Sequence, residues 1–186
     1  MTSGQFPVLR AWGDKVSGVA LVMREGFSPR YDLDRLTGVI SRPGHSAEGE
    51  SVAGRILLIP TVKGGVAGGW AFADLLHKGI APRALVFGRL NPVMVQGAVL
   101  ARLPIMEGLP PEALRRIRTG DLIEVDPAAR CVRLVAPADA GPAGPPAAAL
   151  QPPRRLVPAS PNTAAPASSQ VAGSGTGTGS GASSGS

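Results

Sequence analysis

Residues 55–87, RILLIPTVKGGVAGGWAFADLLHKGIAPRALVF, decide the fold class of this chain. The short apolar run Arg55–Pro60 predicts a buried strand, and Arg83–Phe87 predicts a second one. A glycine-rich loop follows the first strand, and the segment up to Gly79 predicts a helix. The residues at helical spacing in that segment are Trp70, Ala73, Leu76 and His77. A strand, a helix and a strand in this order are typical of a sheet with helices packed on it.

The alternation continues on both sides of this stretch. Ser17–Arg24 predicts an earlier strand, and the fifty N-terminal residues as a whole are β-like and rich in loops. Further along, the sequence predicts a helix capped by Asn91 and started by Pro92, a strand over Leu103–Met106, a helix from Pro111 to Gly120, and a hairpin of residues 121–126 and 130–135 with Pro127 in its turn. The pattern predicts an α/β domain.

The composition divides the chain into two parts. Glycine and proline make up 44 of the 186 residues, about twice their average share. In the last 51 residues, Ala, Gly, Pro and Ser occupy 38 positions and no aromatic residue occurs. Such a segment cannot bury enough apolar surface to offset the entropy cost of ordering it. We therefore expect a folded domain over residues 1–135 and a disordered tail over residues 136–186.

Charge and hydropathy exclude several classes of protein. The net charge is +6, but the basic residues are scattered singly except for Arg115 and Arg116 in the domain. No zinc-finger, helix-turn-helix or aromatic–basic pattern accompanies them, so we expect no nucleic-acid partner. The longest apolar region, Ile80–Met106, is interrupted by arginines and prolines, which excludes a transmembrane helix. The first residues do not resemble a signal peptide, and we expect a soluble cytoplasmic protein.

A single cysteine, Cys131, limits the chemistry of the chain. One thiol cannot form an internal disulfide, an iron–sulfur cluster or a cysteine-rich zinc site. Cys131 lies in a predicted strand, which indicates a packing role. No metal-binding histidine pair and no nucleophile elbow are present either. The chain alone therefore does not resemble a complete enzyme.

The glycine-rich loop is the most informative candidate site. It joins a predicted buried strand to a helix, and its glycines leave the backbone N–H groups uncovered. The N-terminus of a helix offers unpaired N–H groups and a partial positive charge, so it can hold a carboxylate or phosphate. Lys63 adds a full positive charge beside Gly64 and Gly65. The alternative is a tight turn whose glycines serve only close packing of strand and helix.

Three further residues are candidates for substrate binding. Arg30 can clamp a carboxylate, although a surface loop with a local ion pair explains its neighbourhood equally well. His45 can act as an acid or a base, but no partner is visible in the sequence. Asn91 can reach a ligand, although its position also suits a simple helix cap. We predict no metal ligand in this chain.

These residues together resemble a known family, the small subunits of the aconitase X dehydratases. The resemblance covers about residues 18–135 and none of the tail. It rests on His45, Gly49, Ser51–Pro60, Lys63-Gly64, Ala81–Val86, Asn91-Pro92 and Gly97-Ala98. It implies a swivelling, barrel-like β/β/α domain that closes over a large partner subunit, which holds an iron–sulfur cluster through its own cysteines. It also implies a hydro-lyase that acts on a small anionic hydroxy acid.

One departure from the family pattern leaves two functions open. The resemblance places the family's catalytic serine at Gly65, and glycine has no side chain that could take a proton. The first hypothesis is a hydro-lyase subunit whose base is another residue or lies in the partner. The second is a non-catalytic anion-binding or regulatory module that keeps the loop.

Overall fold

The computed structural model describes residues 4–64 and 67–139. The predicted tail lies outside these residues except for its first four positions. The helices are α1 (Ala67–His77), α2 (Pro92–Leu100) and α3 (Pro111–Arg116). The strands are β1 (Gln5–Pro7), β2 (Arg10–Trp12), β3 (Val16–Val22), β4 (Leu33–Asp34), β5 (Val39–Ile40), β6 (Ile56–Thr61), β7 (Ala84–Arg89), β8 (Ile105–Glu107), β9 (Leu122–Asp126) and β10 (Cys131–Ala136).

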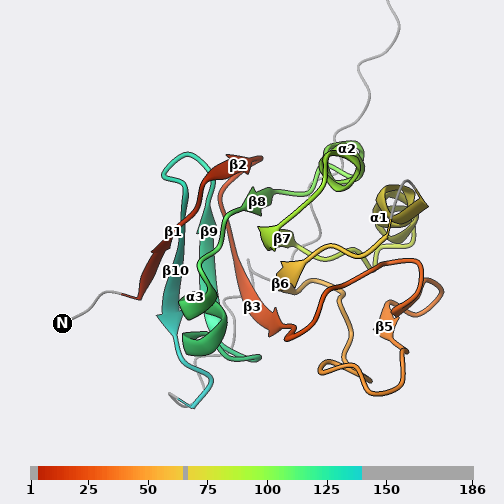
Figure 1. Ribbon diagram of the computed structural model, residues 1–186, viewed down its shortest axis with the longest axis horizontal. Coiled ribbons are helices and arrows are strands. Elements are labelled where there is room, and N and C mark those ends of the chain that lie inside the picture. The colour runs from red at the N-terminus through yellow and green to blue at the C-terminus, as the bar shows by residue number, and fades with distance from the viewer. Residues whose placement is uncertain (1–3, 65–66, 140–186) are drawn as a thin grey trace, which may run out of the picture. The chain divides into compact units, whose positions relative to one another are not determined.

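Eight strands form one sheet that closes on itself. Their order is β1-β10-β9-β3-β6-β7-β8-β2, with the central strands β3, β6, β7 and β8 parallel (Figure 1). Although β1 and β2 stand at opposite ends of this order, only Val8 and Leu9 separate them along the chain. The N–H of Val8 bonds to the Arg130 carbonyl at 2.9 Å, and that of Leu9 to the Glu107 carbonyl at 2.8 Å. The N-terminal ribbon therefore joins both edges into a barrel.

The two faces of the sheet bury two separate cores. Along β6, Ile56 and Leu58 point into the barrel interior, whereas Leu57 and Ile59 point to the opposite face. β7 alternates in the same way, as the period of two residues in a strand requires. Because both faces of these parallel strands are covered, β6 and β7 read as almost continuous apolar runs.

The helices divide between these two cores. α1 and α2 lie side by side over the outer face of the sheet (Figure 1). Ala113 of α3, and Ile117 directly after this helix, are buried in the barrel interior. The predicted helix between β6 and β7 is present, but its packed face is formed by Ala71, Phe72 and Leu75. Trp70 is 62% exposed. Spacing alone identified the helix but not the side that packs.

Most predicted elements are confirmed, with shifted ends. The hairpin of β9 and β10 turns at Pro127, and Cys131 is buried in β10. The helix that begins at Pro111 ends at Arg116, earlier than the predicted Gly120, because the chain is already extended at Ile117. The mixed α/β barrel-like fold is confirmed.

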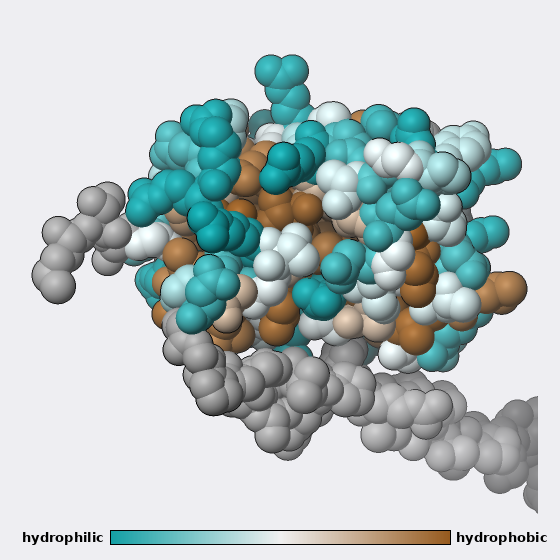
Figure 2. Space-filling view, turned by 90° about the horizontal axis from the view of Figure 1, so that it is seen from below, coloured by the Kyte–Doolittle hydropathy of each residue, from teal (hydrophilic) through white to brown (hydrophobic). Residues whose placement is uncertain are grey.

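The described surface carries both hydrophilic and hydrophobic residues. In the view from below, hydrophobic residues are visible between larger hydrophilic areas (Figure 2). Among the described residues, eight large apolar side chains are exposed, including Leu9, Trp70 and Leu100. No helix in the described part of the chain is long and apolar enough to cross a membrane.

Candidate functional site

Three loops meet at the carboxyl edge of the parallel strands. The loop after β3 runs beside the start of the glycine loop: the N–H of Phe27 bonds to the Thr61 carbonyl at 3.0 Å, and that of Lys63 to the Phe27 carbonyl at 2.9 Å. The Val62 N–H bonds to the carbonyl of Arg89, the last residue of β7, at 3.2 Å. The carboxyl edge of parallel strands is the usual ligand site of such sheets.

The glycine loop lies at this edge, between β6 and α1. Lys63 and Gly64 are exposed, and Gly64 has φ +92°, a conformation that favours glycine. Gly65 and Val66 lie outside the described residues, and α1 begins at Ala67. The loop thus places a lysine and a left-handed glycine just before the N-terminus of a helix. This arrangement suits an oxyanion.

Asn91 holds the glycine loop against α2. Its Oδ1 accepts a hydrogen bond from the Met94 N–H at 2.9 Å, which confirms the predicted cap. Its Nδ2 donates to the Gly64 carbonyl at 3.2 Å. Both polar atoms of the Asn91 side-chain amide are therefore bonded to the protein. Any effect of Asn91 on a ligand comes from positioning Gly64.

Arg30 lies in the loop after β3 and is exposed. Its guanidinium carbon lies 5.6 Å from the centre of the Tyr31 ring. The local ion pair expected for Arg30 is not among the ion pairs of the described residues, because its neighbour Asp32 pairs instead with Arg42, from outside this loop, at 3.0 Å. Arg30 is therefore available to a ligand.

Arg30 belongs to a wider group of exposed cations, which we call the basic rim. It consists of Arg24, Arg30, Lys63 and Arg89, on the loops or strand ends of the same sheet edge. Within the described residues, no carboxylate oxygen lies within 4.0 Å of these four charged groups. Such a group raises the local concentration of small anions.

His45 is buried beside this edge rather than exposed at it. Its Nδ1 accepts a hydrogen bond from the Ala47 N–H at 3.1 Å and lies 3.4 Å from Oε1 of Glu25. The rings of His45 and Phe27 pack in a T-shaped arrangement, with their centroids 6.5 Å apart. The buried Nε2 of His45 has no hydrogen-bond partner among the described residues.

Glu25 is the charged neighbour of His45. Partial burial raises the pKa of this carboxyl, but the hydrogen bonds from Ser46 and the nearby His45 outweigh it, so that the pKa is lowered overall. Glu25 therefore stays ionised. Its carboxylate contacts Ser46 and His45, and it forms no ion pair with the basic rim.

Sequence reasoning missed two residues of this edge, Ser28 and Asp32. Both are buried, and Oδ2 of Asp32 accepts a hydrogen bond from the Ser28 N–H at 2.8 Å. The only signal in the sequence is a serine followed, four positions later, by an aspartate, in the loop between β3 and β4. That spacing is typical of a loop closed by an aspartate.

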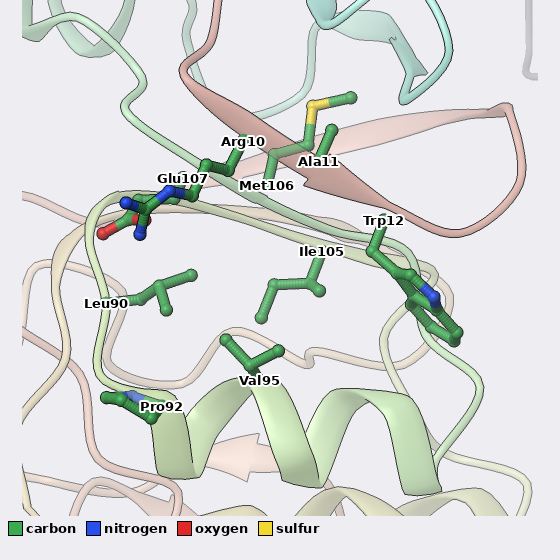
Figure 3. Close-up of a pocket in the computed structure, with 9 residues that line it drawn as sticks. All are labelled: Arg10, Ala11, Trp12, Leu90, Pro92, Val95, Ile105, Met106 and Glu107. Carbon is green, nitrogen blue, oxygen red and sulfur yellow. The ribbon is translucent and has the colours of Figure 1, made fainter.

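A separate apolar groove lies between α2 and the β2–β8 edge. It measures about 410 Å³, with Ile105 and Val95 facing one another across it (Figure 3). Arg10 and Glu107 lie at one end, where they form an ion pair at 3.3 Å, and Trp12 lies at the other. The basic rim contributes no residue to the lining of this groove.

Comparison with known proteins identifies the family. A family model described as the aconitase X swivel domain matches residues 6–134. The chain belongs to the aconitase X swivel domain family. This match confirms the resemblance that the sequence motifs indicated.

Curated relatives and a solved structure agree with this assignment. The chain is 30% identical over 67% of its length to a protein of Methanocella arvoryzae named phosphomevalonate dehydratase small subunit, covering 95% of that protein. It is 34% identical over 63% of its length to a protein of the same name from Thermococcus sibiricus, covering 88% of it. The crystal structure of Thermococcus kodakaraensis aconitase X in its holo form matches with a TM-score of 0.65 and 26% identity, covering 70% of this chain and 98% of that chain.

Proposed function

We propose that this aconitase X swivel domain is the small subunit of a hydro-lyase that dehydrates a small anionic hydroxy acid together with a large partner subunit. The family match and the small-subunit names of the relatives support the proposal. The observation that carries it is that the basic rim, which includes Lys63, lies at the same sheet edge as Gly64, whose φ of +92° is in the left-handed region. Phosphomevalonate, named in the relatives, is the first substrate to test.

In this proposal the chain binds and orients the substrate. Lys63 and the amides of Gly64 and Gly65 hold an oxyanion of the substrate. Asn91 fixes Gly64, and Arg30 attracts the anion towards the edge. His45 supports the loop after β3 through its contacts with Glu25 and Phe27. The proton abstraction is left to a group other than residue 65, which has no side chain.

The iron–sulfur cluster that the family implies does not fit this chain's own residues. The described part of the chain contains no group of three histidine, cysteine or acidic residues that could hold a metal. Its single thiol, Cys131, is buried in β10. We therefore assign the cluster to the large subunit, where it would supply a Lewis acid for the departing hydroxyl.

Co-expression with a large subunit encoded nearby tests the proposal. We expect a stable complex that dehydrates a hydroxy acid, assayed first on phosphomevalonate and then on a panel of hydroxy acids. A complex that binds these acids without turnover supports the second function, a non-catalytic anion-binding module. Turnover by this chain alone contradicts the assignment of the cluster to a partner.

Lys63→Ala tests the anion site within that complex. We expect weaker substrate binding, by about 1–3 kcal/mol, because a charge-assisted hydrogen bond is lost. Lys15→Ala, which changes an exposed lysine paired with Glu124 and Asp126 away from the rim, is the control. Equal KM values in the two variants contradict the anion site.

Gly65→Ser tests whether a hydroxyl on the loop is needed. If the chain lacks only the family's serine, turnover rises. If another group has taken over the proton transfer, turnover is unchanged or falls. The same kinetic assay of the complex distinguishes these results.

A further inference from the structure

A buried serine faces the glycine loop from the neighbouring loop. A Cβ built on Gly64 would lie 3.3 Å from Oγ of Ser28, so the missing side chain of Gly64 leaves this hydroxyl uncovered on that side. Ser28 is only 2% exposed. The hydrogen bonds of Ser28 to other described residues all use its backbone N–H and carbonyl. The hydroxyl is not one of the fully buried side-chain atoms that lack a partner, so it remains reachable on the side of Gly64. A ligand oxygen held beside Gly64 can therefore accept its hydrogen bond.

The backbone of Ser28 is fixed on both sides. Its N–H donates to Asp32 Oδ2 at 2.8 Å, and its carbonyl accepts from the N–H groups of Tyr31 and Asp32 at 3.1 and 2.9 Å. Asp32 is itself held by Arg42 at 3.0 Å. The hydroxyl therefore has a defined position before any ligand arrives, which lowers the entropy cost of binding one.

Lys63 comes close to the same loop. A Cβ on Gly26, two residues before Ser28, would lie 2.9 Å from Cγ and 3.0 Å from Cε of Lys63. The lysine side chain thus lies over Gly26, and the Asn91 amide holds the Gly64 carbonyl at 3.2 Å. An ammonium group, a hydroxyl and the start of the glycine loop are brought together from two separate loops.

We propose that Ser28 is a substrate-binding residue, whose hydroxyl donates a hydrogen bond to an oxygen of the carboxylate or phosphate held at the glycine loop. This inference rests on the proposed function and adds a residue to its site. Ser28 selects for an oxyanion because its hydroxyl is one hydrogen-bond donor beside a fixed positive charge. The aspartate and arginine behind it are positioning residues.

The test uses the reconstituted complex with three variants at residue 28. Ser28→Ala and Ser28→Cys remove a strong donor, and we expect each to raise KM about 10- to 100-fold with kcat nearly unchanged, as loss of a hydrogen bond to a charged group does. Ser28→Thr keeps the hydroxyl and restores most of the affinity. Ser41→Ala, an exposed serine in the following loop, is the matched control.

A second measurement does not depend on turnover. The full chain is titrated with inorganic phosphate while the amide signals of Ser28 and Gly64 are followed by NMR. We expect a saturable shift in the wild type that Ser28→Ala weakens and Ser41→Ala does not.

The two assays separate the possible failures. An active complex whose KM is the same in Ser28→Ala overturns the role of Ser28 and leaves the proposed function standing. A complex inactive on every hydroxy acid overturns the proposed function, and the phosphate titration then decides on Ser28 alone. No phosphate shift in the wild type, or an equal shift in Ser28→Ala, overturns the inference.

Discussion

Asp32 is the residue that holds the loop after β3. Its carboxylate is 1% exposed and bonds both the Ser28 N–H and the Arg42 guanidinium. We expect Asp32→Ala to lower the free energy of unfolding by about 1–3 kcal/mol, because a buried N–H loses its charged partner. The half-exposed Arg42 returns to water, so the larger cost of breaking a fully buried pair does not apply.

Urea unfolding measures this effect. Asp14→Ala, which removes an exposed carboxylate in another loop, is the control and should stay within about 0.5 kcal/mol of wild type. Equal stability of the two variants would show that the loop does not depend on Asp32.

Glu25 predicts a pH dependence of stability. Its pKa is lowered from the ordinary value of 4.5 in the folded chain, so the folded state favours the ionised carboxyl. The stability gained is therefore complete above that ordinary value and is lost as the pH falls through the lowered pKa. Unfolding of wild type and Glu25→Gln should differ most near neutral pH and converge in acid. A difference that stays constant down to about pH 3 contradicts the lowered pKa.

At the residue scale, the sequence indicated which residue types could bind a ligand, but not which residues lie next to one another in the fold. Lys63 and Gly64 could be found because a glycine run between a strand and a helix has a local meaning. Ser28 could not, because its significance comes from a loop 36 residues further along the chain. The burial of His45 was hidden for the same reason: its neighbours Glu25 and Phe27 precede it by about twenty residues.

At the element scale, Asn91 links the start of α2 to the glycine loop. Asn91→Ala removes the cap and the bond to Gly64, and we expect a loss of about 1 kcal/mol in stability together with weaker phosphate binding. Asn91→Asp keeps an acceptor for the Met94 N–H but loses the donor to Gly64.

Comparing these two variants separates the two tasks of Asn91. Thermal unfolding should place Asn91→Asp near wild type, while the phosphate titration should place it near Asn91→Ala. If Asn91→Asp binds phosphate as wild type does, the bond to Gly64 does not position the loop.

Long, locally encoded elements were the predictable part of the fold. β6, β7 and the β9–β10 hairpin have apolar runs bounded by glycine or proline, and α2 has a cap and a proline at its start. The very short strands β1, β2, β4 and β5 contain two or three residues each, too few to show a period. β1 and β2 form on the longer sheet, through β10 and β8, whereas β4 and β5 pair with each other in a separate two-stranded sheet.

At the scale of the whole molecule, closure of the barrel was the least predictable feature. It depends on pairing β1 with β10 and β2 with β8, across about 126 and 95 residues of sequence. No local pattern encodes such pairing. Bringing together strands so far apart in sequence costs chain entropy, and only contacts with the rest of the sheet offset that cost. The family resemblance supplied the barrel-like expectation that periodicity alone could not.

Two truncations test the division of the chain between a closed barrel and a dispensable tail. Deleting residues 1–12 removes β1 and β2 and takes the buried Phe6 and Val8 out of the barrel core. Burying each such side chain contributes about 1.5–3 kcal/mol, so the loss of stability is a large part of the 5–15 kcal/mol typical of a domain.

Truncation after Asp139 keeps all of β10 and the hydrogen bond from the Ala138 N–H to Asp121. On composition alone, we expect it to leave the melting temperature within about 2 °C of wild type. Differential scanning calorimetry of both truncated chains decides: a large drop on removing residues 140–186 would show that the tail stabilises the domain, and an unchanged melting temperature without residues 1–12 would show that the barrel does not need its closing ribbon.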